Sequence, residues 1–167
     1  IDVNWQNLGI FQRGGVVLDL GPHPLSIILL LMDLKFPKKI TSNSYSHKIK
    51  GICDTASISM DWGNVQANIN LSWLYPHKNR TITIVGEKQM MVWDDTSPLD
   101  KLRLYDKSCK FHDAYNSFGT FQMSYKYGDT ISYKVEPKEP LVLELEDFLS
   151  DGVESVSSPE LGHMVMR

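Results

Sequence analysis

Residues 55–75 read TASISMDWGNVQANINLSWLY, and apolar and polar residues alternate along most of this stretch. A period of two is typical of a β-strand with one buried face, and the Gly63-Asn64 pair between two such runs predicts a hairpin turn. The apolar positions are Ala56, Ile58, Met60 and Trp62 before the turn, and Val65, Ala67, Ile69, Leu71 and Trp73 after it. The stretch therefore predicts an antiparallel hairpin with one apolar face.

Further strands and several helices are predicted on both sides of this hairpin. Turn-forming residues, among them Gly128-Asp129, separate strand candidates at 38–47, 80–86, 89–95, 101–106, 118–127 and 131–136. Helices are predicted at 14–20, 24–34 and 139–152, and a capped helix in SSPELGHMVMR near the C-terminal end. The first is expected to end at Gly21-Pro22, because glycine suits a helix C-terminus and proline cannot continue the helix. This order of elements predicts an α+β fold, a large and mostly antiparallel open sheet with helices packed on one face.

The polar face of the predicted sheet contains few charges. Its small, uncharged residues are Thr55, Ser57, Ser59, Gln66, Asn68, Asn70, Ser72, Thr81 and Thr83. A water-facing sheet surface ordinarily carries Lys and Glu, whereas charge is depleted where subunits meet. The sequence leaves both interpretations open: an ordinary solvated face, or a face that packs on a second subunit.

The composition fits a single globular domain over residues 1–167. The chain has 42% apolar and 22% charged residues, which allows an adequate core. Seventeen basic against 20 acidic residues, with no long basic run, argue against a nucleic-acid partner. The longest apolar run, IILLLM, is too short to cross a bilayer, and no secretory signal is recognisable. The widely spaced Cys53 and Cys109 indicate reduced thiols, so we expect a cytoplasmic protein with no membrane partner and no bound metal.

Asp19 and His23 are the strongest candidates for chemistry. They lie in RGGVVLDLGPHPLSIILLLMDL, residues 13–34, immediately before an apolar helix. Three nearby glycines allow another chain segment or a ligand to come close, and the prolines on both sides of His23 stiffen this corner. A carboxylate near an imidazole can orient it as an acid/base group. The alternative is structural: Asp19 caps a helix, and His23 is hydrogen-bonded at the start of the next one.

The remaining polar residues carry weaker signals. His47, His77, His112 and His163 are scattered without metal-ligand spacing, and we expect them to be solvated or capping residues. The Asp94-Asp95 pair precedes Ser97-Pro98 and is interpreted as part of a turn. No G-x-G-x-x-G motif follows a predicted strand, so the chain brings no dinucleotide site of its own.

Several of these segments together resemble the C-terminal domain of the oxidoreductase family named for glucose–fructose oxidoreductase, inositol dehydrogenase and a rhizopine-catabolism protein. In GGVVLDLGPHPLSIILLLMDL a glycine pair is followed by Asp, Gly and His at the family's spacing. The segments SWLYPHKNRTITIVGEKQMMVWDD, LRLYDK, SYKYGD and EPLVLELEDFL follow in the family's order. The last three are most similar to the branch that oxidises nucleotide-activated amino sugars, such as a 3-dehydrogenase of a UDP-N-acetylhexosamine derivative.

The resemblance implies roles for two residues of this chain. Asp19 and His23 would line a sugar site beside the nicotinamide, where His23 relays the proton of the hydroxyl being oxidised and Asp19 holds His23 or a sugar hydroxyl. Many members carry an Asp three residues after the His, and Ser26 stands at that position here. Ser26 therefore leaves open the role that the family's Asp has at this position, whereas Asp19 and His23 both match the family.

The resemblance also implies a cofactor and partners. NAD or NADP would be bound mainly by an N-terminal Rossmann domain that this chain does not contain, so the chain alone is expected to be inactive. The substrate would be a sugar or nucleotide-sugar, and the polar sheet face would form a homo-oligomer, either a dimer or a tetramer. The alternative is a stand-alone binding or dimerisation module without catalysis. The sequence does not identify the sugar, the hydroxyl or the choice between NAD and NADP.

Overall fold

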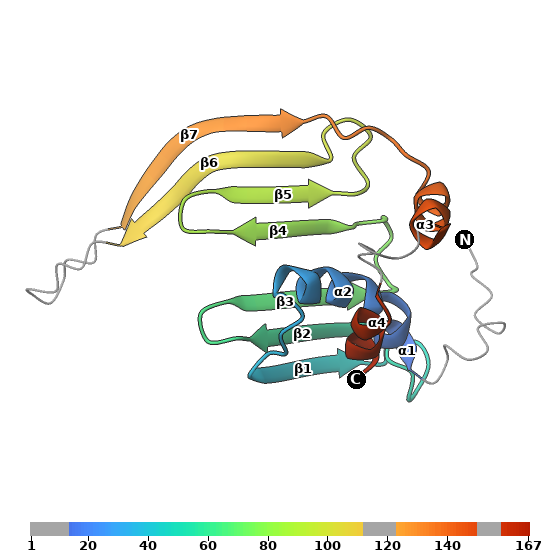
Figure 1. Cartoon of the computed structure of the whole chain (residues 1–167). Helices are drawn as coiled ribbons and strands as arrows, with labels where there is room; N and C mark the ends of the chain where they lie inside the picture. Colours follow the sequence, from blue (N-terminus) through green and yellow to red (C-terminus); the bar gives the residue numbers. More distant parts are fainter. Residues whose placement is uncertain (1–13, 112–122, 150–157) are drawn as a thin grey trace, which may run out of the picture. The chain divides into compact units, whose positions relative to one another are not determined.

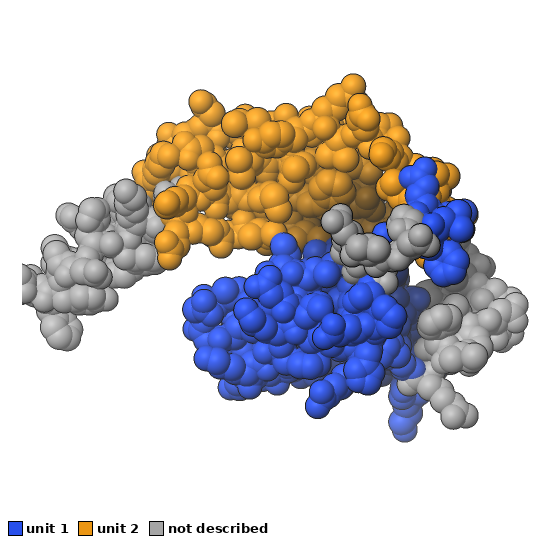
Figure 2. All heavy atoms as spheres, viewed as in Figure 1, with its two compact units in different colours: residues 1–75, 145–167 blue, residues 76–144 orange. Residues whose placement is uncertain are grey.

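The structure is a computed structural model that describes residues 14–111, 123–149 and 158–167. Contacts along the backbone divide the chain into two compact units, residues 1–75 with 145–167 and residues 76–144 (Figure 2). Each unit is built around its own antiparallel sheet.

The first unit combines two short helices with a three-stranded sheet (Figure 1). The helices are α1 (Gly15–Leu20) and α2 (Pro22–Leu31). The strands β1 (Lys39–Tyr45), β2 (Thr55–Asp61) and β3 (Gln66–Ser72) are antiparallel in the order β1-β2-β3. A backbone hydrogen bond of 2.9 Å from Trp62 N to Val65 O closes the turn between β2 and β3. The predicted hairpin is thus confirmed.

The hydrophobic core of the described residues lies between these helices and one face of the sheet. Burial alternates along β2 and β3 as the sequence predicts, with the apolar side chains inward. The core consists of Val16 from α1 together with Ala56, Ile58, Met60, Trp62, Ile69 and Leu71, and α2 adds Leu25, Ile28 and Met32 at its margin. Helix α4 (Pro159–Met166) packs on α2, and its first turn is capped by Ser158, whose hydroxyl accepts a hydrogen bond from Leu161 N at 3.2 Å.

The second unit is a four-stranded antiparallel sheet. Its strands are β4 (Thr81–Val85), β5 (Met90–Asp94), β6 (Leu102–Phe111) and β7 (Met123–Tyr133), in the order β4-β5-β6-β7. None of the side chains described between residues 76 and 144 is fully buried, so the core described above belongs to the first unit alone. Helix α3 (Pro140–Leu149) begins at a proline, as predicted, and its apolar residues are exposed.

The α+β class and the antiparallel strands agree with the sequence analysis, and helices cover one face of the first sheet. The structure differs in dividing the strands between two sheets of three and four, where one large sheet was expected.

Of two chain breaks predicted at glycines, one is wrong. Gly128-Asp129 is not a turn, because β7 runs through it and the β6–β7 register shifts between Tyr105 and Lys107 opposite. A Cβ on Gly128 would overlap the carbonyl oxygen of Asp106, so glycine is needed there for close approach of the two strands. The predicted end of the first helix at Gly21-Pro22 is confirmed, because α1 ends at Leu20 and α2 begins at Pro22, although the φ of −65° and ψ of −39° at Gly21 are themselves helical.

Candidate functional site

Asp19 and His23 lie on either side of the junction between α1 and α2. Gly21 has helical dihedral angles, and hydrogen bonds connect it to both helices: Gly21 N is bonded to Val17 O at 2.9 Å, and Leu25 N to Gly21 O at 3.1 Å. Pro22 starts α2 without disrupting it, because the first turn of a helix needs no N–H donor. Residues four apart on a helical path lie on the same side, so the junction places both candidates on one side of the segment.

The two candidate side chains have different surroundings. The Asp19 carboxylate is half-buried, and its Oδ2 accepts a hydrogen bond of 2.7 Å from the indole Nε1 of Trp73. The His23 side chain is exposed, and its backbone carbonyl accepts a 2.8 Å bond from the Ser26 hydroxyl. Within the described part of the chain, Asp19 and His23 form no hydrogen bond with each other. Asp19 is therefore oriented by an indole, and Ser26 is engaged by its own helix.

The start of α1 lies against the loop that precedes β2. Val16 N donates to Cys53 O at 2.8 Å, and Gly15 has a left-handed φ of +59°. A Cβ on Gly15 would overlap that same carbonyl oxygen. The close approach that the glycines predicted is thus to another chain segment, and it fixes α1, which carries Asp19, on the loop.

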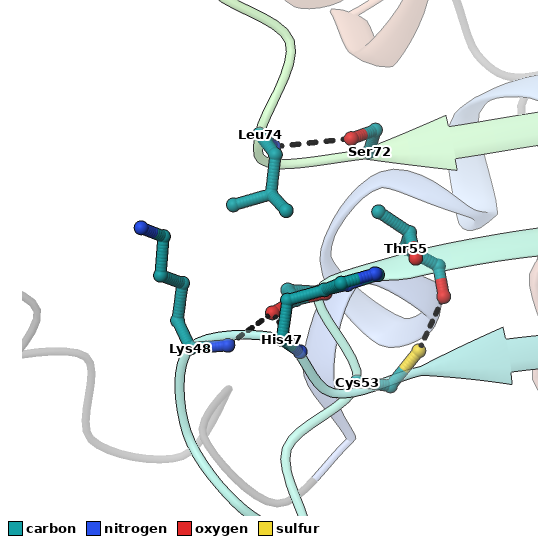
Figure 3. Close-up of polar contacts among 7 residues, drawn as sticks. His47, Lys48, Cys53, Thr55, Ser72 and Leu74 are labelled. Atoms are coloured by element: carbon teal, nitrogen blue, oxygen red, sulfur yellow. Dashed lines mark hydrogen bonds and ion pairs between the residues drawn. The ribbon is translucent and has the colours of Figure 1, made fainter.

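A second carboxylate–imidazole pair occurs in this loop, between β1 and β2 (Figure 3). Asp54 is buried, with 4% of its surface exposed, and its Oδ1 lies 2.8 Å from Nδ1 of His47. Its Oδ2 accepts the backbone N–H groups of His47 at 2.7 Å and Lys48 at 2.8 Å. Burial acts to raise the pKa of Asp54, but the His47 side chain and the two N–H donors outweigh it and hold this pKa below its usual value.

His47 was expected to be a solvated or capping residue, and its side chain is 53% exposed, whereas Asp54 was not singled out from the sequence. The contact depends on the strand register: Tyr45 pairs with Thr55 at the end of the first hairpin, so the loop that contains His47 closes beside Asp54, the residue that precedes Thr55. Asp54 also connects to β3, because its carbonyl accepts the Trp73 backbone N–H at 3.0 Å. The pair therefore anchors the loop beside the residue that holds Asp19.

The other candidates lie where the sequence placed them or outside the description. His77 and His163 are exposed, and His112 lies outside the described residues. Asp94 is the last residue of β5 and Asp95 begins the turn that was predicted here: Asp94 Oδ1 accepts the Thr96 hydroxyl at 2.6 Å and the Thr96 N–H at 3.0 Å, and these bonds lower the pKa of Asp94. Among the described residues, no three His, Cys, Asp or Glu side chains gather as metal ligands would. No helix there is long and apolar enough to cross a membrane.

Two side-chain hydrogen bonds connect β2 and β3 on the polar face of the first sheet. Ser57 Oγ donates to Asn70 Oδ1 at 2.9 Å, and Gln66 Nε2 donates to Ser59 Oγ at 3.1 Å. The same face forms a shallow open depression whose polar lining includes Thr41, Asn43, Ser57, Ser59, Asn68 and Asn70. No charged residue lines this depression, although Lys39 and Asp61 pair with each other at one end of the same face.

Comparison with known protein families identifies this fold. Residues 4–92 match the family model described as the GFO/IDH/MocA C-terminal domain. The chain belongs to the GFO/IDH/MocA oxidoreductase family. The matched segment contains Asp19, His23 and the whole sheet of the first unit. A comparison with curated proteins gives no match.

Solved structures support the same fold. The chain is similar to UDP-N-acetylglucosamine 3-dehydrogenase GnnA from Acidithiobacillus ferrooxidans, with 18% identity, a TM-score of 0.70, and coverage of 90% of this chain and 43% of that one. It is also similar to the Bacillus subtilis protein YvaA, described as an oxidoreductase, with 15% identity, a TM-score of 0.55, and coverage of 93% and 47%. A Klebsiella pneumoniae protein described as an oxidoreductase has 18% identity, a TM-score of 0.54, and coverage of 91% and 44%. The chain thus spans less than half the length of each of these structures.

Proposed function

We propose that this chain is the substrate-binding and oligomerisation half of an NAD(P)-dependent oxidoreductase that oxidises a hydroxyl of a sugar. The proposal rests on the junction of α1 and α2 in a domain of this oxidoreductase family. At this junction the exposed imidazole of His23 lies four residues along the chain from the carboxylate of Asp19, which a hydrogen bond holds in place. The similarity to a UDP-N-acetylglucosamine 3-dehydrogenase supports a nucleotide-activated amino sugar as the first substrate to test.

The chemical role of this chain in the reaction is proton transfer. Oxidation of a secondary alcohol to a ketone breaks one O–H and one C–H bond, releasing a proton and a hydride. His23 accepts the hydroxyl proton as general base, which its exposure allows. Asp19, whose Oδ2 is already bonded to Trp73, holds the imidazole or a substrate hydroxyl through its other oxygen.

The cofactor does not fit within the described part of the chain. Every strand pair there is antiparallel, so no described segment forms the parallel β-α-β unit that holds a dinucleotide pyrophosphate. We assign NAD(P), which supplies the hydride acceptor when bound, to a separate N-terminal domain. The small extent of this chain relative to the similar solved structures is consistent with that division.

The test uses the two-domain protein that this proposal requires, with UDP-N-acetylglucosamine and NAD or NADP, and follows formation of the reduced nicotinamide. His23→Gln retains hydrogen bonding but cannot relay a proton, so turnover should fall by about 10²- to 10⁴-fold. Asp19→Asn should cause a smaller but clear loss. The exposed His77 provides a matched control, since His77→Gln should leave turnover unchanged. Wild-type turnover in both the His23 and the Asp19 variants would favour a binding or dimerisation module without catalysis.

A further inference from the structure

The indole of Trp73 is the hydrogen-bond partner of the Asp19 carboxylate in the described structure. Trp73 follows β3, and its Nε1 donates to Asp19 Oδ2 across 2.7 Å. An indole N–H can only donate, so it favours an Asp19 side chain that remains an acceptor. The other oxygen, Oδ1, has no hydrogen bond to any described residue and is left for a ligand or for His23.

Trp73 is itself held from two directions. Its ring packs against the core of the first unit, and its backbone N–H donates to the Asp54 carbonyl at 3.0 Å. Asp54 is in turn fixed by its bonds to His47 and Lys48. The loop that carries Asp54 also accepts the Val16 N–H from the first turn of α1, at Cys53 O, so one loop positions both the helix of Asp19 and the donor to Asp19.

We propose that Trp73 is a positioning residue for alcohol oxidation, because its indole N–H fixes one oxygen of Asp19 and so presents the other to His23 or to a substrate hydroxyl. The inference rests on the proposed function of Asp19 and His23. It adds a residue outside their segment that acts through Asp19. Trp62 provides a matched comparison, since its Nε1 also donates from this core, but to the carbonyl of Lys35 at 2.9 Å.

The first experiment tests the contact in the full chain without substrate. The chain has four tryptophans, and their indole N–H resonances are separated in a ¹⁵N-labelled sample and assigned by Trp→Phe substitution. Asp19→Ala should shift the Trp73 indole resonance toward the position of a free indole and leave the Trp62 resonance in place. An unmoved Trp73 resonance would overturn the proposal, whatever the activity of the protein.

The second experiment is a double-mutant cycle in the two-domain protein, with UDP-N-acetylglucosamine and the nicotinamide cofactor. Trp73→Phe should lower kcat by about 10-fold, the scale of one hydrogen bond to a charged group, with little change in KM. In an Asp19→Asn background, the same substitution should lower kcat no further. Trp62→Phe should leave kcat unchanged in both backgrounds.

The outcomes separate this inference from the proposed function. If His23→Gln abolishes turnover but Trp73→Phe lowers kcat equally in the wild-type and the Asp19→Asn backgrounds, Trp73 has only a structural role and this inference fails alone. If His23→Gln and Asp19→Asn both turn over at the wild-type rate, the proposed function fails and the positioning role fails with it.

Discussion

At the scale of single residues, the polar contacts in the described structure differ from those expected from the sequence. Asp19 was expected to orient His23 or cap a helix, and it is bonded to Trp73, 54 residues away along the chain. Periodicity places Trp73 on the apolar side of its strand, but it carries no information on where an indole N–H points. The Asp54–His47 pair was missed for a similar reason, because it depends on the pairing of β1 with β2.

The Asp54 carboxylate should make stability depend on pH in the acid range. Its pKa is lower in the folded chain than the ordinary value of about 3.9, so ionised Asp54 stabilises the fold above that pH, and this contribution is lost as the pH falls through the lowered folded pKa. Asp54→Asn removes the dependence. The difference in free energy of unfolding between the wild type and this variant should be constant near neutral pH and should narrow below about pH 4.

Urea unfolding over a pH series measures that difference. Asp33→Asn is the control, because Asp33 belongs to an exposed 3.5 Å pair with Lys35 and such surface pairs contribute little. A constant gap between the wild type and Asp54→Asn down to about pH 2 would show that the carboxylate does not stabilise the fold through its charge.

At the scale of elements, the hairpin, the antiparallel strands and the helices α3 and α4 could be predicted because each has a local signal: a period of two, a turn pair or a cap. The β7 bulge could not be distinguished from a turn, since Gly128-Asp129 suits both and the decision lies in the partner strand. The division into two sheets depends on pairing between distant strands, which alternation within one strand does not specify.

The contact between α1 and the loop before β2 should depend strongly on Gly15. Gly15→Ala combines a left-handed φ of +59° with a Cβ that would overlap a backbone oxygen, so we expect a loss of at least about 2 kcal/mol in the free energy of unfolding. Gly51→Ala is the matched control: its φ of +82° is also left-handed, but a Cβ there meets nothing within 4 Å. It should cost about 1 kcal/mol. Equal losses in urea unfolding would mean that the Gly15 contact contributes nothing beyond backbone strain.

At the scale of the whole molecule, the chain belongs to the GFO/IDH/MocA C-terminal domain family, and every strand pair described in it is antiparallel. We predict that this chain alone binds neither NAD nor NADP measurably, because its described strands offer no pyrophosphate-binding turn. Calorimetric titration with both cofactors checks this. Micromolar affinity would require a nucleotide site in this chain and would contradict the assignment of the cofactor to another domain.

The polar face of the first sheet should determine whether the chain self-associates. We propose that this face, poor in charge and exposed in the single chain, packs on a second copy. Asn70 lies on β3 opposite Ser57 of the central strand and lines the depression of this face, so Asn70→Lys would place an unpaired charge in the contact. In a two-fold symmetric dimer the charge enters from both sides, so the dissociation constant should rise by at least about 100-fold.

Two controls isolate the effect of the charge in sedimentation or sizing measurements at matched concentrations. Asn70→Ala removes the bond from Ser57 without adding charge, so it should leave the assembly largely intact. Asn64→Lys adds the same charge at the exposed turn between β2 and β3, away from the middle of the face, and should also leave the assembly intact.

Because Asn70→Lys loses the Ser57 bond as well, its melting temperature should match that of Asn70→Ala when both variants are monomeric. If Asn70→Lys and the wild type have the same molecular mass in solution at every concentration, the face is exposed to solvent and forms no subunit contact. Its small polar residues would then serve only the hydrogen bonds between β2 and β3.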